Sequence, residues 1–140
     1  MFDFLKNIFK TSEAPQKPRA ESANSLIVAA KVIGVEKHPN ADRLRIIKLD
    51  IGGKEIYPVV CGAFNFGQGD TVALALPGAR IAHNIHSDAH ESFTLGTAKI
   101  RGVESRGMIC APFELGLGPL SDKPEIMLLK ESAKPGSAVI

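Results

Sequence analysis

Three cations lie within eight residues of one another in the segment AKIRGVESRGMICAP, at Lys99, Arg101 and Arg106. Glycines between them let a backbone approach a ligand closely, because glycine has no side chain. Lysine and arginine side chains gathered on one strand and its loop can contact the phosphate groups of a nucleic acid. The segment therefore predicts a phosphate-contacting surface, although the net charge of the whole chain is only +2.

The segment KHPNADRLR places polar and basic residues around a predicted turn. Pro39 ends a strand there, and the side chain of Asn40 or Asp42 can cap the free N–H groups of the turn. Arg43 and Arg45 follow at the start of the next strand. Two interpretations stay open on spacing alone, a well-capped turn with solvated charges or a further part of a binding surface.

Potential metal ligands are concentrated in AHNIHSDAHES, where His83, His86, Asp88 and His90 are spaced i, i+3, i+5 and i+7. Three imidazoles and a carboxylate suit Zn²⁺ if the loop folds around the ion. Histidines in such a polar loop are more often exposed to solvent, so we expect no metal site.

No catalytic motif accompanies these segments. The sequence has no G-x-S-x-G, P-loop, G-x-G-x-x-G, H-E-x-x-H or C-x-x-C signature. Cys61 and Cys110 lie in the apolar contexts VVCGA and MICAP, which favour two reduced core thiols over a cross-strand disulfide. We therefore expect a non-enzymatic protein without a cofactor.

Length and composition fit one globular domain with a tail. The chain has 140 residues, of which 44% are hydrophobic and 23% charged, as in ordinary globular proteins. Its 17 Lys and Arg nearly balance its 15 Asp and Glu, which argues against a histone-like protein that condenses DNA. No run of 18 apolar residues occurs, and Asp3 lies where a secretory signal would carry positive charge. We expect a soluble, cytoplasmic protein without a membrane partner.

Residues 1–23 differ from the rest of the chain. Phe2, Leu5, Ile8 and Phe9 recur at roughly helical spacing, and the segment TSEAPQKPRAESAN that follows is rich in Pro, Ser, Ala and charge. The pattern predicts a short amphipathic helix and a flexible linker. A helix of about ten residues is marginal by itself in water, so it docks on the domain, frays, dimerises, or meets a partner or a membrane surface.

From Leu26 onward the pattern is that of a β protein. Apolar and β-branched residues dominate the runs LIVAAKVIGVEKH, LRIIKLDI, EIYPVVCGA, TVALALPG and MICA. Gly52-Gly53 supplies a two-residue hairpin turn, Pro58 indicates an edge or bulged position, and the changing parity of LRIIKLDI predicts a β-bulge. FELGLG predicts one helical turn, and IMLLKE a further apolar element. The low helix content favours a small closed or partly open barrel.

Four ordered motifs resemble one known family. HPNADRL and KIRGVESRGMICA, connected by LDIG and VVCGA, closely resemble the tRNA-binding domain of the EMAP-II type. This domain occurs at the N-terminus of the bacterial phenylalanyl-tRNA synthetase β subunit, in free-standing tRNA-binding proteins, and attached to methionyl- and tyrosyl-tRNA synthetases. VCGA and ALPGA, with ELGLG after MICAP, are most similar to the phenylalanyl β-subunit branch. The resemblance covers residues 26–118, and the sequence departs from the family at residues 1–23 and 83–90.

The resemblance implies an all-β, five-stranded OB-fold barrel with C-terminal additions, formed by residues 24–140, that binds tRNA largely by shape and backbone. Within the matched motifs, Ser105 could bond a phosphate or a 2′-hydroxyl, whereas Met108 is more typical of a core. The residues expected to bind RNA are His38, Asn40, Arg43, Arg45, Lys99, Arg101, Ser105 and Arg106.

We expect a free-standing, non-catalytic tRNA-binding protein that is an accessory to aminoacylation, with tRNA and an aminoacyl-tRNA synthetase as partners. A homodimer is expected as well, because Ile126–Leu129 is a spare apolar element that can cover a barrel edge. The alternative is a protein-interaction or chaperone-like OB module that has lost RNA binding, and a third hypothesis is a metal-responsive protein built on the histidine loop. Scattered aromatic residues favour readout of RNA shape over base stacking.

Overall fold

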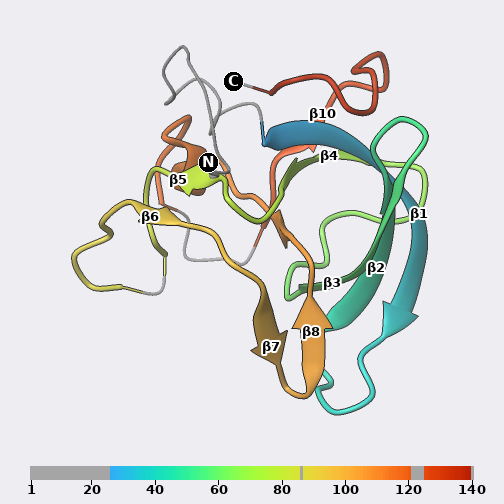
Figure 1. Ribbon diagram of the computed structural model, residues 1–140, viewed down its shortest axis with the longest axis horizontal. Helices are drawn as coiled ribbons and strands as arrows, with labels where there is room; N and C mark the ends of the chain where they lie inside the picture. The colour runs from blue at the N-terminus through green and yellow to red at the C-terminus, as the bar shows by residue number, and fades with distance from the viewer. Residues whose placement is uncertain (1–25, 86, 121–124, 140) are drawn as a thin grey trace, which may run out of the picture.

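The computed structural model describes residues 26–85, 87–120 and 125–139 (Figure 1). Within these residues the structure is all-β, and a three-residue 3-10 helix is the only helix. The elements are β1 (Ile27–Lys37), β2 (Arg45–Asp50), β3 (Glu55–Cys61), β4 (Thr71–Ala75), β5 (Arg80–Ile81), β6 (Phe93–Thr94), β7 (Ala98–Ile100), β8 (Val103–Ser105), β9 (Met108–Ile109), η1 (Phe113–Leu115) and β10 (Leu128–Leu129).

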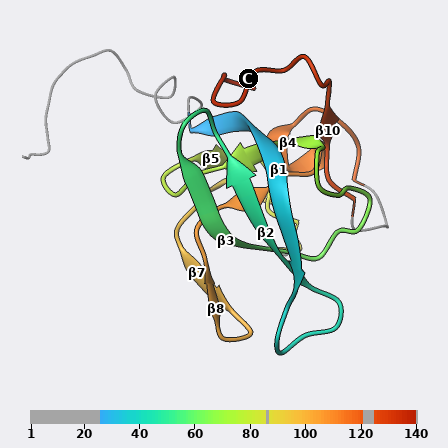
Figure 2. The same ribbon diagram turned by 90° about the vertical axis from the view of Figure 1, so that its right-hand side faces the viewer.

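One curled antiparallel sheet forms the body of the molecule (Figures 1 and 2). Its strands follow the order β10-β4-β1-β2-β3, and β9 also pairs with β4. The chain after β8 lies against β3, where the Arg106 N–H donates to the Pro58 carbonyl at 2.9 Å. Because the segment from β8 to β9 reaches from β3 to β4, it links the two sides of the sheet. The expected all-β fold is confirmed, and its curled sheet is consistent with an OB-like fold. The count of five barrel strands stays a prediction.

Strand β4 separates two hydrophobic cores, because successive side chains on a strand point to opposite faces. Val72 and Leu74 belong to the core inside the curl of the sheet, together with Ile47 and Leu49. The small side chains of Ala73 and Ala75 point to the other face and belong to a second core. This second core contains Ile27, Ala73, Ala75, Ala79, Ile81, Cys110 and Leu115.

The expected turns and irregularities lie in the expected pairs of strands. Gly52 and Gly53 have φ angles of 94° and 98° and occupy the two-residue turn between β2 and β3, a conformation that glycine adopts readily. The pairing of β2 with β3 shifts register between Ile47 and Leu49, opposite the Tyr57-Pro58 pair. The additional residue lies on β3 rather than on β2, so Pro58 lies in a bulged region as predicted. The bulge predicted within LRIIKLDI is wrong, because the irregularity belongs to the strand that pairs with it.

Two C-terminal segments add to the sheet. Leu128 and Leu129 pair with Val72 and Thr71 of β4. Part of the predicted apolar element IMLLKE therefore forms strand β10. Residues 136–139 then run along β1, where the Val139 N–H donates to the Ile27 carbonyl at 3.0 Å. Both edges of β1 near its start are therefore covered.

Both cysteines are free and buried, in agreement with the expected core thiols. Burial raises the pKa of the Cys61 thiol and that of the Cys110 thiol, and the carboxylate of Glu114 adds to both effects. The predicted amphipathic helix and linker at 1–23 lie outside the described residues. None of the helical structure that is described is long and apolar enough to cross a membrane.

Candidate nucleic-acid interface

A β-hairpin presents the cations of the segment KIRGVESR. Strands β7 and β8 pair with Ile100 opposite Val103, which leaves Arg101 and Gly102 as a two-residue turn with φ angles of 52° and 92°. Positive φ at both central residues is typical of the tight hairpin turn that matches strand twist. The turn places Arg101 at the exposed tip of a hairpin that projects from the sheet (Figures 1 and 2).

The turn between β1 and β2, residues 38–44, packs against the tip of this hairpin. His38 is only 1% exposed, and its Nε2 lies 3.0 Å from the carbonyl oxygen of Ile100. Asn40 donates from Nδ2 to the carbonyl oxygen of Arg101, also at 3.0 Å. Two motifs that are about 60 positions apart in the sequence are thereby brought together at one end of the molecule.

The buried position of His38 favours a positioning role over the direct RNA contact expected from the sequence. Its Nδ1 accepts a hydrogen bond from the backbone N–H of Asn40 at 3.0 Å, so the ring hydrogen is assigned to Nε2, which donates to Ile100. Both ring nitrogens are therefore used within the fold.

Ser105 is also used within the fold. It is 4% exposed, its hydroxyl accepts from the backbone N–H of Val60 at 2.9 Å, and it donates to the Gly107 carbonyl at 2.9 Å. Gly107 itself lies so close to β4 that a Cβ atom would come 2.9 Å from the Ala75 carbonyl oxygen. Ser105 thus fastens the base of the hairpin to β3, and its place favours a structural role over the expected contact with a phosphate or 2′-hydroxyl.

Arg45 is half-buried and is bonded within the fold. Its Nη2 donates to the carbonyl oxygens of Ala63 and Phe66 at 3.0 and 2.9 Å, and its guanidinium lies 4.6 Å from the ring centroids of both Phe64 and Phe66. Cation–π contacts of this kind stabilise a partly desolvated arginine. Of the expected RNA-binding residues, Arg45 is therefore the cation least available to a ligand.

Four of the expected cations remain at the surface. Arg43, Lys99, Arg101 and Arg106 are all exposed. Lys99 lies directly across from Glu104 in the β7–β8 pair, and Lys37, which the sequence analysis did not include among the binding residues, forms an exposed ion pair with Asp42 at 3.7 Å. An exposed ion pair of this kind contributes little to stability, so Lys37 stays free to exchange its partner.

The histidine loop packs on an aromatic ring. His83 stacks on Phe113 of η1 with 4.8 Å between ring centroids, and His90 meets the same ring edge-on at 5.2 Å. His86 lies outside the described residues, and among those that are described no group of three or more His, Cys, Asp or Glu side chains could hold a metal ion. The two histidines thus pack against η1, in contrast to the solvent exposure expected for this loop.

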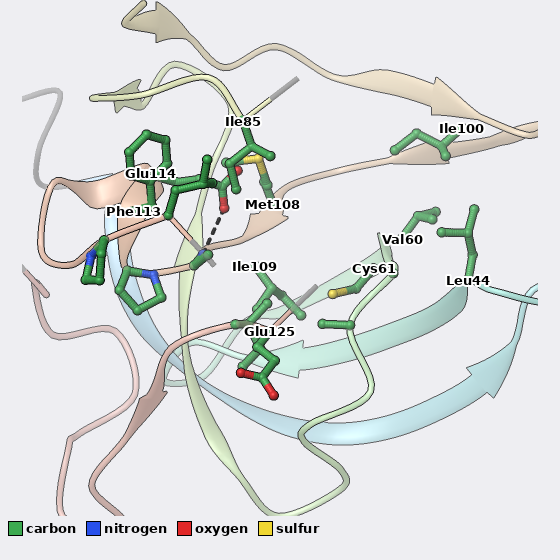
Figure 3. A pocket seen from close by; sticks show the side chains of 17 residues that line it. Leu44, Val60, Cys61, Ile85, Ile100, Met108, Ile109, Phe113, Glu114 and Glu125 are labelled. Carbon is green, nitrogen blue, oxygen red and sulfur yellow. Dashed lines mark hydrogen bonds between the residues drawn. The ribbon is translucent and has the colours of Figure 1, made fainter. Parts of the chain in front are cut away.

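An apolar pocket of about 560 Å³ lies beside the hairpin. Figure 3 shows Leu44, Val60 and Ile100 at one end of it and Phe113 and Glu114 at the other. Its described lining contains two glutamates and no lysine or arginine. The pocket therefore offers no positive charge to a phosphate, and the exposed cations outside it form the candidate interface.

Comparisons with known proteins identify a family that covers most of the chain. Residues 27–138 match the family described as "Putative tRNA binding domain". The chain is 43% identical over 106 residues to the phenylalanine–tRNA ligase β subunit of Wolinella succinogenes, covering 76% of this chain and 12% of that protein. It is 37% identical over 127 residues to the β subunit of Aromatoleum aromaticum, covering 91% and 15%. The chain thus spans about one eighth of the length of these relatives.

Two solved structures share the fold. A MetRS-related protein from Pyrococcus horikoshii superposes with a TM-score of 0.59 at 17% identity, over 90% of this chain and all of that one. The C-terminal domain of Plasmodium vivax p43 gives a TM-score of 0.55 at 20% identity, over 81% and 58%. The resemblance found in the motifs is confirmed, and the chain belongs to the putative tRNA-binding domain family.

Proposed function

We propose that this chain binds tRNA without catalysing a reaction, through contacts between exposed cations and the phosphate backbone. The proposed contact residues are Arg43, Lys99, Arg101 and Arg106. The observation that carries the proposal is the docking of the 38–44 turn on the hairpin tip, which gathers basic residues from two distant motifs. Loops between the first two strands and between the last two strands of OB folds are the usual place for oligonucleotides to bind.

The surface suits shape readout better than base stacking. Among the described aromatic residues, Tyr57 and Phe64 are exposed, but the Tyr57 hydroxyl faces Glu36 and Phe64 lies against Arg45. A single-strand binder usually offers several aromatic faces in a row. Phosphate contacts with a folded RNA of defined outline are therefore the better match.

The proposal also covers the barrel strands, the synthetase partner and the cellular location. Strands β1, β2, β3 and β4 together with the β8–β9 segment would form the five-stranded OB barrel of a domain at residues 24–140. Homologous segments occur within phenylalanine–tRNA ligase β subunits, so an accessory role in aminoacylation, a synthetase partner and a cytoplasmic location belong to the proposal. The alternative, an interaction module without RNA affinity, predicts no tRNA binding at any salt concentration.

The test is a titration of unfractionated tRNA into the protein at two salt concentrations. We expect an affinity that falls with salt, because bound lysines and arginines release counterions from the RNA. The variant K99E/R101E/R106E should lose binding. The single variant Arg101→Gln, which removes one phosphate contact, should lower the magnitude of the salt slope by about 0.7 to 0.9.

A matched control reverses three exposed cations elsewhere. Lys54, Lys130 and Lys134 are exposed residues in the segments that follow β2 and β10. The β2–β3 turn approaches Pro135, and these segments lie at the end of the molecule away from the β7–β8 hairpin (Figure 1). K54E/K130E/K134E changes the net charge equally and should bind tRNA nearly as well as the unaltered protein. Equal loss in both variants would indicate a nonspecific charge effect, and retained binding in K99E/R101E/R106E would place the interface elsewhere.

A further inference from the structure

Two side chains of the 38–44 turn hold the tip of the β7–β8 hairpin from outside. His38 reaches the Ile100 carbonyl and Asn40 reaches the carbonyl of Arg101, the next residue. We propose that His38 and Asn40 are positioning residues for RNA binding, which fix the backbone that carries Arg101. The inference rests on the tRNA-binding function proposed above and assigns the part that two uncharged residues play in it.

His38 is suited to such a role by its burial and its bonding. At 1% exposure the imidazole is out of reach of a ligand on the surface. It accepts from the N–H of Asn40 through one nitrogen and donates to Ile100 through the other. The neutral ring therefore ties its own turn and the hairpin into one unit, and it also fixes the start of the segment from which Asn40 extends.

The hairpin needs external support at its tip. Its strands have three residues each, and two short strands by themselves are marginally stable in water. Arg101 also adopts a φ angle of 52°, which is unfavourable for a residue with a side chain. The base is fastened to β3 through Ser105 and the Arg106 N–H, so the two bonds from the 38–44 turn are those that hold the tip.

The fit between the two segments is close. A Cβ atom on Gly102 would lie 3.3 Å from Nδ2 of Asn40, so this side chain lies directly over the turn whose carbonyl it binds. A surface held in its binding geometry before the ligand arrives loses less conformational freedom on binding. His38 and Asn40 therefore contribute to affinity through Arg101, by keeping its backbone in place.

The experiment measures tRNA affinity for variants that remove each bond separately. His38→Asn is too short to reach Ile100, and Asn40→Ala lacks the donor to Arg101. We expect each to weaken tRNA binding about fivefold, which corresponds to about 1 kcal/mol, the usual worth of one hydrogen bond. His38→Gln places an amide nitrogen near the position of Nε2 and should recover most of the lost affinity.

Asn65→Ala is the matched control. Asn65 also bridges distant segments, because its amide donates to the Ile126 carbonyl at 3.0 Å and accepts from the Ile126 N–H at 3.1 Å. It fastens the C-terminal segment and not the hairpin, so its removal should leave tRNA affinity within twofold of the unaltered protein. Equal weakening by Asn65→Ala would show that any loss of long-range bonding lowers affinity, and would overturn the proposal.

A double-mutant cycle separates positioning from a general structural effect. In an Arg101→Gln background, His38→Asn and Asn40→Ala should weaken tRNA binding no further, because the side chain that they position is gone. The same fivefold loss in both backgrounds would overturn the proposal. So would unchanged affinity in both single variants.

Amide hydrogen exchange of the free protein distinguishes failure of this inference from failure of the function. His38→Asn should speed exchange at Gly102 and Val103 while leaving exchange in β1 and β4 unchanged. Unchanged exchange at the tip, with tRNA binding intact in the unaltered protein, would overturn the positioning role alone. Absence of tRNA binding by the unaltered protein would overturn the proposed function, whatever exchange at the tip showed.

Discussion

Ser105 shows how the fold can use a hydroxyl that the sequence presents as available. The residue stands in a polar and glycine-rich segment, which is typical of an exposed loop. In the structure its hydroxyl receives the Val60 N–H and donates to Gly107, because β3 lies alongside the segment that follows β8. Gly107 is only two positions away, but Val60 is 45 positions away, and no local pattern of the sequence predicts that contact.

Removal of this hydroxyl should destabilise the protein. In Ser105→Ala the buried N–H of Val60 loses its acceptor, and an unsatisfied buried donor costs about 1 to 3 kcal/mol. We expect a lower denaturant midpoint with an unchanged slope of the unfolding transition.

Ser137→Ala provides the comparison for this variant. The Ser137 hydroxyl also donates to a carbonyl, that of Lys134, but in an exposed turn. Its loss should change stability by no more than about 0.5 kcal/mol. A small effect in both serine variants would show that Ser105 is not needed to hold the hairpin to β3.

The cations of the site could be chosen by type from the sequence, but their exposure could not. Arg43, Lys99, Arg101 and Arg106 lie at the surface as a binding role requires, whereas Arg45 is half-buried against the rings of Phe64 and Phe66. Burial depends on neighbours that the chain brings in from about 20 to 60 positions away. The family resemblance placed the motifs correctly, and the structure separates residues available for contact from residues that hold them.

At the scale of elements, local patterns were most informative for continuous strands. The apolar runs of β1 and β4 and the glycine pair at 52–53 follow short-range rules of alternation and turn geometry, and the structure has them where expected. The β7–β8 hairpin was predicted only as a short basic strand and a turn. Its docking could not be predicted, because the hydrogen bonds that define it join residues more than 60 positions apart.

Close contact between the β8–β9 segment and β4 depends on Gly107. A Cβ atom there would meet the Ala75 carbonyl oxygen at 2.9 Å and Cδ1 of Leu74 at 3.1 Å, which a packed interior accommodates only by shifting the backbone. Gly107→Ala should therefore lower the free energy of unfolding by about 1 to 3 kcal/mol, measured by chemical denaturation.

The contrasting substitution is Gly67→Ala. A Cβ atom on Gly67 would meet nothing within 4 Å, so this variant should unfold at nearly the same denaturant concentration as the unaltered protein. Equal stability of both alanine variants would contradict the close approach of the β8–β9 segment to β4.

At the scale of the whole molecule, the expected homodimer stays a prediction that the position of β10 makes testable. Ile126 is buried in the main core, but the side chain of Leu128 is 49% exposed. We expect light scattering to give twice the chain mass of 14.9 kDa at micromolar concentration. Leu128→Asp should produce the monomer, because a charge at an apolar contact opposes association.

Two further variants locate the dimer contact. Leu117 is similarly exposed, at 52%, but lies beyond η1, so Leu117→Asp should leave the dimer intact. Deletion of residues 1–23 should leave both the fold and the dimer intact if β10 forms the contact. A monomer in the unaltered protein would refute the dimer, and a monomer only after the deletion would assign the contact to the N-terminal segment.

The hydrogen bond between the Val139 N–H and the Ile27 carbonyl joins the two ends of the described fold. It places the point where the chain enters the described fold next to the point where it leaves, and both lie at the end of β1 away from the hairpin tip (Figure 1). A unit whose entry and exit adjoin can be inserted within a host polypeptide without stretching either connection. In the relatives, the matched segment forms a small fraction of a much larger chain, 12% and 15% of its length.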